Sequence, residues 1–254
     1  MNRYYYDLHI HSCLSPCADD EATPANIAGI AALNGLQIAA LTDHNTTRNC
    51  PAFCEAAKHY GLIPIPGMEL TTSEDIHVIC LFRTLEAAVS FDRVIAQERV
   101  RVRNRPEIFG DQLVMDADDT ILDHEQDLLI NETRLSLKDA FLLCQEYGGV
   151  CYPAHIDRSS NGILAALGAF PDVPRYTAYE LNRADAGEEY RNKYPNIREL
   201  SCVVSSDAHA LENISEAKHF FELEDEPYSS RLVIENLFAF LQRKHPNTEE
   251  KVHV

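Results

Sequence analysis

The chain has 254 residues, of which 45% are hydrophobic and 24% are charged, as is typical of a globular protein with a full core. It lacks both a secretory signal and the roughly 18 uninterrupted apolar residues of a membrane span, so we expect a cytoplasmic protein with no membrane partner. Its eight cysteines are then expected to be free thiols. The formal net charge of −18 predicts that long nucleic acid is not a partner.

Short apolar strands alternate with helical segments along the chain, which is the pattern of repeated strand–helix units. The segment 23–36 begins with Thr23 as an N-cap and Pro24 in the first helical position, and it stops at Gly35, so it predicts a helix. The other elements expected in the first part are strands over 4–10, 37–45, 62–72 and 76–82, and helices over 50–61 and 85–103.

Residues 105–131 interrupt this alternation, because apolar and acidic residues alternate there around the sequence DADD. The pattern fits an inserted β-hairpin. No repeat and no Gly/Ser linker divides the chain, so we expect one domain over 1–254. The elements expected after the insertion are a helix over 136–149, a strand over 150–155, further units through GILAALGAF, AYEL and LSCVVSSDAH, and a final helix over 229–243.

The sequence DLHIHS at 7–12 places two histidines two residues apart. Residues i and i+2 of a strand point to the same face, so His9 and His11 are expected to project together. Imidazole nitrogen binds Zn, Fe, Mn or Ni, but two ligands do not hold a metal alone. Other parts of the chain must therefore supply the remaining ligands.

More residues of metal-ligand type lie at the ends of expected strands, where ligands bind in α/β folds. Each one also has an ordinary structural explanation, such as a histidine satisfied within the core or an aspartate that caps a helix. Their coincidence in one chain favours a metal centre. These residues are Asp43, His44, Glu69, His77, His155, Asp207 and His209.

The motifs DLHIHS, ALTDHN, PGMEL, HVICLF, PAH and SSDAH, in this order, resemble those of the PHP family, the polymerase and histidinol phosphatase phosphoesterases. The resemblance is dense over residues 5–82 and sparser over 150–209. It implies a distorted (β/α)7 barrel, an α/β fold of the TIM type, with two or three divalent metals at the carboxyl ends of its strands. Those metals are commonly Zn, Mn or Fe.

The resemblance also implies which residues hold each metal. The first metal would be held by His9, His11, Glu69 and Asp207. The second would share Glu69 and add His77 and His155, and the third would be held by His44 and His209.

In relatives, the third metal also takes an Asp or His from the loop that follows HxH. Counting back from Pro24 places Asp19 at that position, with Asp20 as a near alternative. Among the cysteines, Cys17 is the best candidate for a metal ligand.

Paired metals about 3.5–4 Å apart, bridged by a carboxylate such as Glu69, clamp the attacking and leaving oxygens of a phosphoryl displacement. Glu69 and Asp207 are therefore the expected catalytic carboxylates. Arg158, which follows the PAH motif, could donate two hydrogen bonds to a terminal phosphate. Asp43 either orients a ligand imidazole or caps a helix.

We therefore expect a metal-dependent phosphoesterase in which metal-bound hydroxide hydrolyses a phosphate monoester, a short oligonucleotide or a nucleotide bisphosphate. The expected partners are small phosphorylated molecules, such as a nucleotide or a sugar or amino-alcohol phosphate. A histidinol-phosphatase-like activity, hydrolysis of an amide or cyclic C–N bond, and a non-catalytic module stabilised by metal stay open as alternatives. The substrate, the metal used in the cell and the oligomeric state are also left open.

Overall fold

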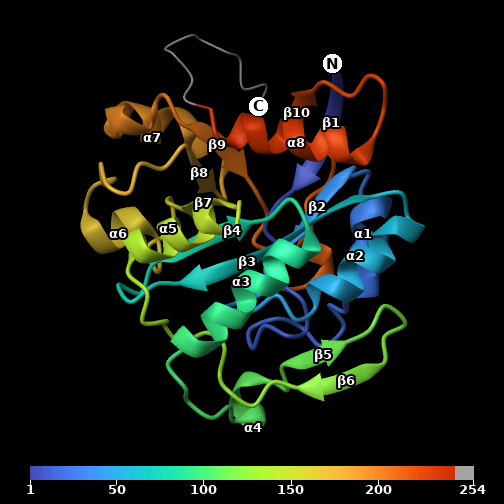
Figure 1. The fold of residues 1–254 in the computed structure, drawn as a ribbon. Coiled ribbons are helices and arrows are strands. Elements are labelled where there is room, and N and C mark those ends of the chain that lie inside the picture. Colours follow the sequence, from blue (N-terminus) through green and yellow to red (C-terminus); the bar gives the residue numbers. More distant parts are fainter. Residues whose placement is uncertain (244–254) are drawn as a thin grey trace.

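The centre of the computed structural model, which describes residues 1–243, is a curled sheet surrounded by helices (Figure 1). Six strands pair in the order β10-β1-β2-β3-β4-β7, and two more, β8 and β9, form a parallel pair. The bounds of these strands are β1 Asn2–Asp7, β2 Ile38–Leu41, β3 Ile63–Thr71, β4 His77–Leu81, β7 Val150–Pro153, β8 Ala178–Leu181, β9 Ser201–Val204 and β10 Phe220–Leu223.

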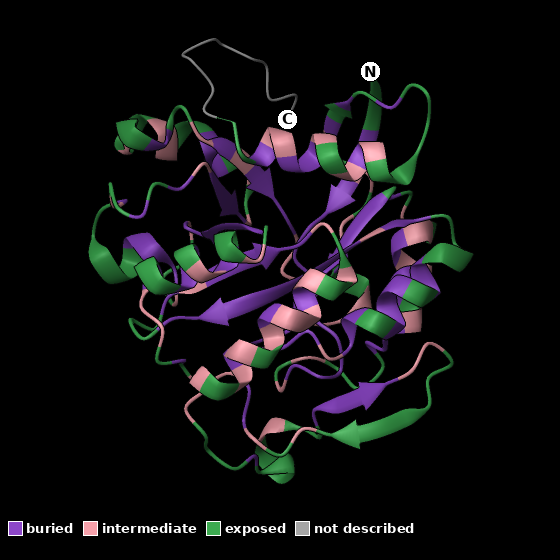
Figure 2. Cartoon of the chain, in the orientation of Figure 1, coloured by how far each residue is buried: buried purple, intermediate pink, exposed green. Residues whose placement is uncertain are grey.

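Contacts at two places close most of this sheet into a barrel. β8 lies against β7, and the segments that follow β1 and β9 meet in a parallel bridge between Ile10 and Ala208. Most residues of these strands are buried, and the strands lie at the centre of the molecule (Figure 2). Seven strands, all of those above except β10, thus surround a common interior, and the expected distorted (β/α)7 barrel is confirmed.

The distortion comes largely from β4, which runs antiparallel to both β3 and β7. The start of β4 at His77 therefore pairs with the end of β3 at Thr71. Because of this reversal, a residue that begins β4 reaches the same end of the barrel as residues that follow the parallel strands.

The helices lie outside the sheet, with their buried faces towards it and their exposed faces outward (Figure 2). Several begin where a hydroxyl side chain accepts a backbone N–H, as Thr23 does from Asn26 and Ser136 does from Asp139. The helix α1 stops before Gly35, which adopts a φ of +80° as a helix stop requires. The bounds are α1 Pro24–Leu33, α2 Cys50–His59, α3 Leu85–Glu98, α5 Leu137–Glu146, α6 Ile163–Leu167, α7 Gly187–Lys193 and α8 Ser230–Leu241.

The insertion is a hairpin, as expected, made of β5 (Leu113–Met115) and β6 (Ile121–His124) and preceded by a short helix α4 (Pro106–Phe109). The expected helix over 85–103 is too long, because α3 ends at Glu98. Beyond that point the chain is extended and forms isolated bridges, Arg99 with Thr133 and Arg103 with Asp127. The sequence RVRVR at 99–103 therefore runs beside the insertion, where Arg99 pairs with Glu125 and Arg101 with Asp127.

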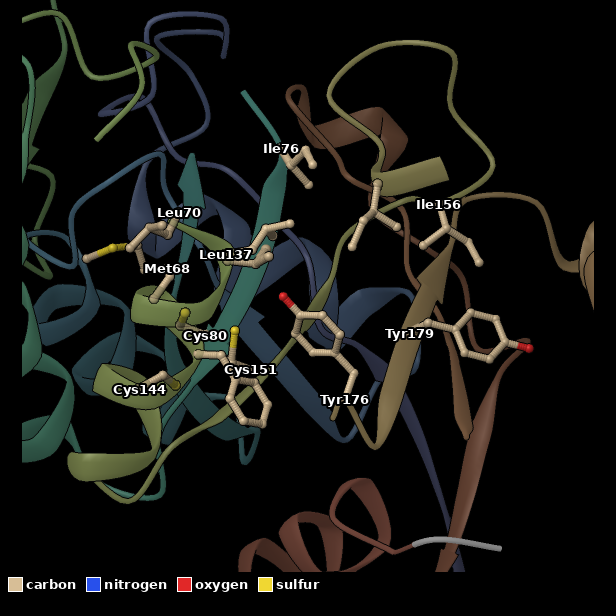
Figure 3. Close-up of a cluster of buried hydrophobic side chains, with 14 of the residues drawn as sticks. Met68, Leu70, Ile76, Cys80, Leu137, Cys144, Cys151, Ile156, Tyr176 and Tyr179 are labelled. Atoms are coloured by element: carbon tan, nitrogen blue, oxygen red, sulfur yellow. The ribbon is translucent and has the colours of Figure 1, made fainter. Parts of the chain in front are cut away.

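A large apolar cluster fills the space between the sheet and α5 (Figure 3). Cys80 of β4, Cys151 of β7 and Cys144 of α5 lie within it as small buried side chains. The cysteines are free thiols, as expected. Among residues 1–243, no helix has the length and apolar character that crossing a membrane requires.

Candidate metal centre

The residues of metal-ligand type converge at one end of the barrel. Parallel strands end there, and β4 begins there because of its reversed direction. His9 and His11 follow β1, His44 follows β2, Glu69 lies in β3, His77 begins β4, His155 follows β7, and Asp207 and His209 follow β9.

The carboxylate of Glu69 is the centre of this arrangement and is only 1% exposed. Burial alone would raise its pKa, but the imidazoles of His77, His9 and His44 hold the pKa well below its ordinary value. Glu69 is therefore an anion enclosed by ring nitrogens. Those nearest Oε1 are on His77 (2.7 Å), His155 (3.0 Å) and His9 (3.4 Å), and those nearest Oε2 are on His44 (3.1 Å) and His11 (3.3 Å).

Asp207, in the segment after β9, approaches both His9 and His11. Its Oδ1 lies 3.2 Å from His9 Nε2 and 3.3 Å from His11 Nε2, and the two Nε2 atoms are 3.0 Å apart. Burial opposes protonation of these rings, but the carboxylates of Asp207 and Glu69 raise the pKa of His11 to about 9. In the metal-free protein, a proton on His11 would thus stabilise the two neighbouring carboxylates.

Among residues 1–243, three groups of side chains have ligand atoms that all lie within 4.8 Å of one another. The first group is the one expected for the first metal. The second contains His44 where His155 was expected, although His155 Nε2 also lies 3.0 Å from Glu69 Oε1. The groups are His9, His11, Glu69 and Asp207; His44, Glu69 and His77; and His11, His44 and His209.

The donor atoms of the centre fit divalent transition metals. Glu69 Oε2, Asp207 Oδ1 and His44 Nδ1 are buried and make no hydrogen bond within the described residues. Buried polar atoms in proteins nearly always have a partner. A set of imidazole and carboxylate donors suits Zn, Mn or Fe, and such an ion would supply the missing partner.

Asp43 acts on a ligand imidazole through a hydroxyl group and caps no helix. The Ser15 hydroxyl donates to Asp43 Oδ1 (2.8 Å), so it accepts from His11 Nδ1 (3.0 Å). The imidazole that Asp43 orients is thus His11, although His44 is its neighbour in the sequence. Ser15 was not predicted, because the loop that carries it has no periodic pattern.

Glu180 is the main residue that the sequence analysis missed. It lies in β8 and is fully buried, and its Oε1 is 2.8 Å from His9 Nδ1. The available signal was a glutamate in the otherwise apolar segment AYEL, where a buried carboxylate needs a partner.

The loop after β1 brings its acidic residues only to the rim of the centre. Asp19 is exposed, and its backbone N–H donates to the carbonyl of His209 (2.9 Å). Among residues 1–243, the groups of potential ligands contain neither Asp19 nor the alternatives Asp20 and Cys17. A role for any of them stays a prediction.

Arg158 reaches the centre through an ion pair between its guanidinium and Asp207 Oδ2. Its side chain is 49% exposed, so part of it faces the open side. A polar cavity of about 620 Å³ adjoins the centre at Asp207 and His209, and Ser206, Ser215 and Lys218 also line it. The buried residues of the centre therefore have a basic group, Arg158, and an open volume next to them.

Comparison with known proteins connects this arrangement to one family. The PHP domain profile matches residues 7–147, which is more than half of the chain. The error-prone DNA polymerase of Symbiobacterium thermophilum is 32% identical over 91 residues, which are 36% of this chain. That match covers only 8% of the polymerase, so the chain corresponds to a small part of this relative.

Two solved structures share the fold at low sequence identity. The lesion-specific endonuclease PfuEndoQ of Pyrococcus furiosus has a TM-score of 0.65 and 18% identity, and the match covers 95% of this chain and 56% of the endonuclease. A proposed metal-dependent phosphoesterase of Bifidobacterium adolescentis has a TM-score of 0.55 and 16% identity. The match covers 98% of this chain and 99% of the phosphoesterase.

The expectation that long nucleic acid is not a partner is wrong. The similar structures include endonuclease Q in complex with a 27-mer duplex that has an abasic lesion at the active site, with a TM-score of 0.56 and 17% identity over 96% of this chain. Net charge was a poor guide because cations bound at such a site offset carboxylates locally. The formal charge of −18 therefore excludes no class of phosphate ester.

Proposed function

This chain belongs to the PHP domain family, and on that premise we propose that it is a metal-dependent hydrolase of phosphate esters. The observation that carries the proposal is the Glu69 carboxylate, whose two oxygens face different sets of imidazoles. A carboxylate placed in this way can bridge two cations, which is the arrangement used to hydrolyse phosphate esters.

The side chains divide into those that would hold metal and those that would position substrate. We assign the first metal to His9, His11, Glu69 and Asp207, and the second to Glu69, His77 and His155, with His44 close enough to Glu69 to join them. Zn, Mn or Fe, when bound, would polarise the phosphoryl group and activate water. His209, together with His11 and His44, completes the group that would hold a third ion.

Arg158 is the group that would grip the phosphate. A cation held by Asp207 would weaken the ion pair between Asp207 and the guanidinium, which would then be free to donate to phosphoryl oxygens. The polar cavity beside Asp207 gives the rest of the substrate a place on the open side. The chain would thereby hold the phosphorus next to the ligand cluster while water replaces the leaving oxygen.

The proposed substrates are phosphate monoesters, nucleotide bisphosphates and nucleic-acid phosphodiesters. A panel of these, including short oligonucleotides and a 27-mer duplex with an abasic site, tests the proposal when it is incubated with metal-loaded protein. We expect hydrolysis that a chelator abolishes and Glu69→Gln removes, whereas Glu222→Gln, at an exposed position on β10, has no effect. Metal-loaded protein that hydrolyses no member of the panel would contradict the proposal and favour a non-catalytic metal module.

A further inference from the structure

We propose that Glu180 is a positioning residue that couples the two metal positions, because one of its oxygens orients both His9 and His155. This inference rests on the proposed metal-dependent function. Glu180 lies in β8 between buried Tyr179 and Leu181, and its side chain is fully buried. A carboxylate in such surroundings is costly unless hydrogen bonds compensate its lost hydration.

The first contact of Glu180 sets the orientation of the His9 ring. Since a carboxylate accepts, His9 Nδ1 carries the proton and donates it to Glu180 Oε1 at 2.8 Å. The lone pair of His9 Nε2 then points into the centre, where Asp207 Oδ1 lies 3.2 Å away and Glu69 Oε1 lies 3.4 Å away. A carboxylate behind a ligand imidazole in this way fixes both its tautomer and its rotation.

The second contact of the same oxygen holds the backbone of His155. The His155 N–H donates to Glu180 Oε1 at 3.2 Å, and the N–H of Ile156 donates to the backbone carbonyl of Glu180 at 2.9 Å. His155 has a φ of +27°, which a residue with a side chain adopts only when its surroundings impose it. Glu180 thus helps to hold His155 in the conformation that brings Nε2 to 3.0 Å from Glu69 Oε1.

The two contacts together connect the two metal positions. His9 and His155 both direct Nε2 at the same oxygen of Glu69, and their rings stack with centroids 5.9 Å apart. Within residues 1–243, the other oxygen of Glu180 makes no hydrogen bond. The hydrogen bonds of this carboxylate therefore serve His9 and His155 and attach it to no other part of the barrel.

The test compares Glu180→Gln with Asp225→Asn in full-length protein. Asp225 is a matched control, since it is a carboxylate that is 5% exposed and accepts from Asn2 and Tyr4 at the other end of β1. Chelator-stripped proteins are titrated with Zn²⁺ in competition with a chelator, and with Co²⁺ while the d–d absorption spectrum is recorded. Circular dichroism checks that each variant is folded.

We expect Glu180→Gln to fold, to bind Zn²⁺ about 10–100-fold more weakly, and to change the Co²⁺ spectrum in both the first and the second binding step. Asp225→Asn should lower the melting temperature without changing either metal measurement. Folded Glu180→Gln with wild-type affinity and spectra would overturn the inference, and a change in only one binding step would overturn the coupling.

A second measurement decides the question if Glu180→Gln does not fold. In zinc-loaded wild-type protein, the ¹⁵N spectrum of His9 should show a protonated Nδ1, whereas a deprotonated Nδ1 would overturn the inference. Failure of the proposed function is distinguishable from failure of this inference. If the proposed function fails, wild-type protein binds metal but hydrolyses no phosphate ester, and Glu180→Gln still weakens metal binding. If only this inference fails, wild-type protein hydrolyses a phosphate ester and Glu180→Gln leaves metal binding unchanged.

Discussion

The inner part of the metal centre, around Glu69, and its outer rim, around Asp19 and Arg158, hold their side chains in different ways. The inner residues His9 and Glu69 are at most 1% exposed, and His9 has a buried partner behind its ring in Glu180. At the rim, Asp19 is exposed and the Arg158 side chain is 49% exposed. From this difference we infer that the inner residues would determine whether metal binds, whereas the rim residues would adjust what the bound metal acts on.

The largest effect that this comparison predicts is that of Glu69→Gln. Removing the shared charge weakens the binding of every cation that Glu69 helps to hold. Metal content should therefore fall by more than one equivalent while the protein still folds. Hydrolysis should fall by more than about a hundredfold, since the loss of an outer partner alone costs 10–100-fold. Metal analysis and initial rates check this. Unchanged metal content and rate in a folded variant would remove Glu69 from the centre.

The pH dependence of stability in the metal-free protein should distinguish His11 from His209. The pKa of His11 is raised to about 9, so its proton stabilises the fold fully below pH about 6.5, and this stability is lost as the pH rises through about 9. The loss is of the order of 3 kcal/mol. Urea unfolding of chelator-stripped protein between pH 6 and pH 10 measures it, with His11→Gln as the variant that should not show it.

His209, nearer the rim, should behave in the opposite way. Burial, followed by the charge of His11, lowers the pKa of His209 to about 4. The unfolded chain therefore binds this proton more readily, and stability decreases as the pH falls from about 6.5 towards 4. His209→Gln should remove that part of the acid-side loss. If the free energy of unfolding decreases equally between pH 6.5 and pH 4 in wild type and His209→Gln, the lowered pKa of His209 is contradicted.

Arg158→Ala should affect substrate and leave metal content unchanged. Loss of charge-assisted hydrogen bonds to phosphate should lower kcat/KM about tenfold to a hundredfold. Arg3→Ala, at an exposed position on β1 that pairs with Glu222, is the matched control and should keep wild-type kinetics. A loss of metal in Arg158→Ala would instead show that the arginine supports Asp207.

The smallest effect is expected for Asp19→Ala. If Asp19 serves a third metal, its removal should lower activity severalfold, and added Mn²⁺ or Zn²⁺ should restore it because the inner ligands stay loaded. Rates with and without added metal check this. The same phenotype in Asp20→Ala or Cys17→Ala, and not in Asp19→Ala, would show that the loop was aligned wrongly.

Sequence patterns located the inner residues better than the rim because strand ends are physically constrained. Residues that directly follow a strand, such as His9 and His155, lie at the mouth of the barrel, whereas the loop that carries Asp19 has no periodicity to fix its side chains. Glu180 was not predicted because the sequence does not reveal which residues a carboxylate within an apolar strand contacts. The end of α3 was placed too late because arginine favours helices intrinsically, while ion pairs such as Arg99 with Glu125 form only in the folded insertion.

The most direct test of the account is a metal titration of chelator-stripped protein in which bound metal and hydrolysis of the best phosphate ester are measured in the same samples. If Glu69 bridges two cations that act together, hydrolysis should be near zero at one equivalent and should rise as the second equivalent binds. Full hydrolysis at one equivalent, or hydrolysis without bound metal, would contradict the central claim.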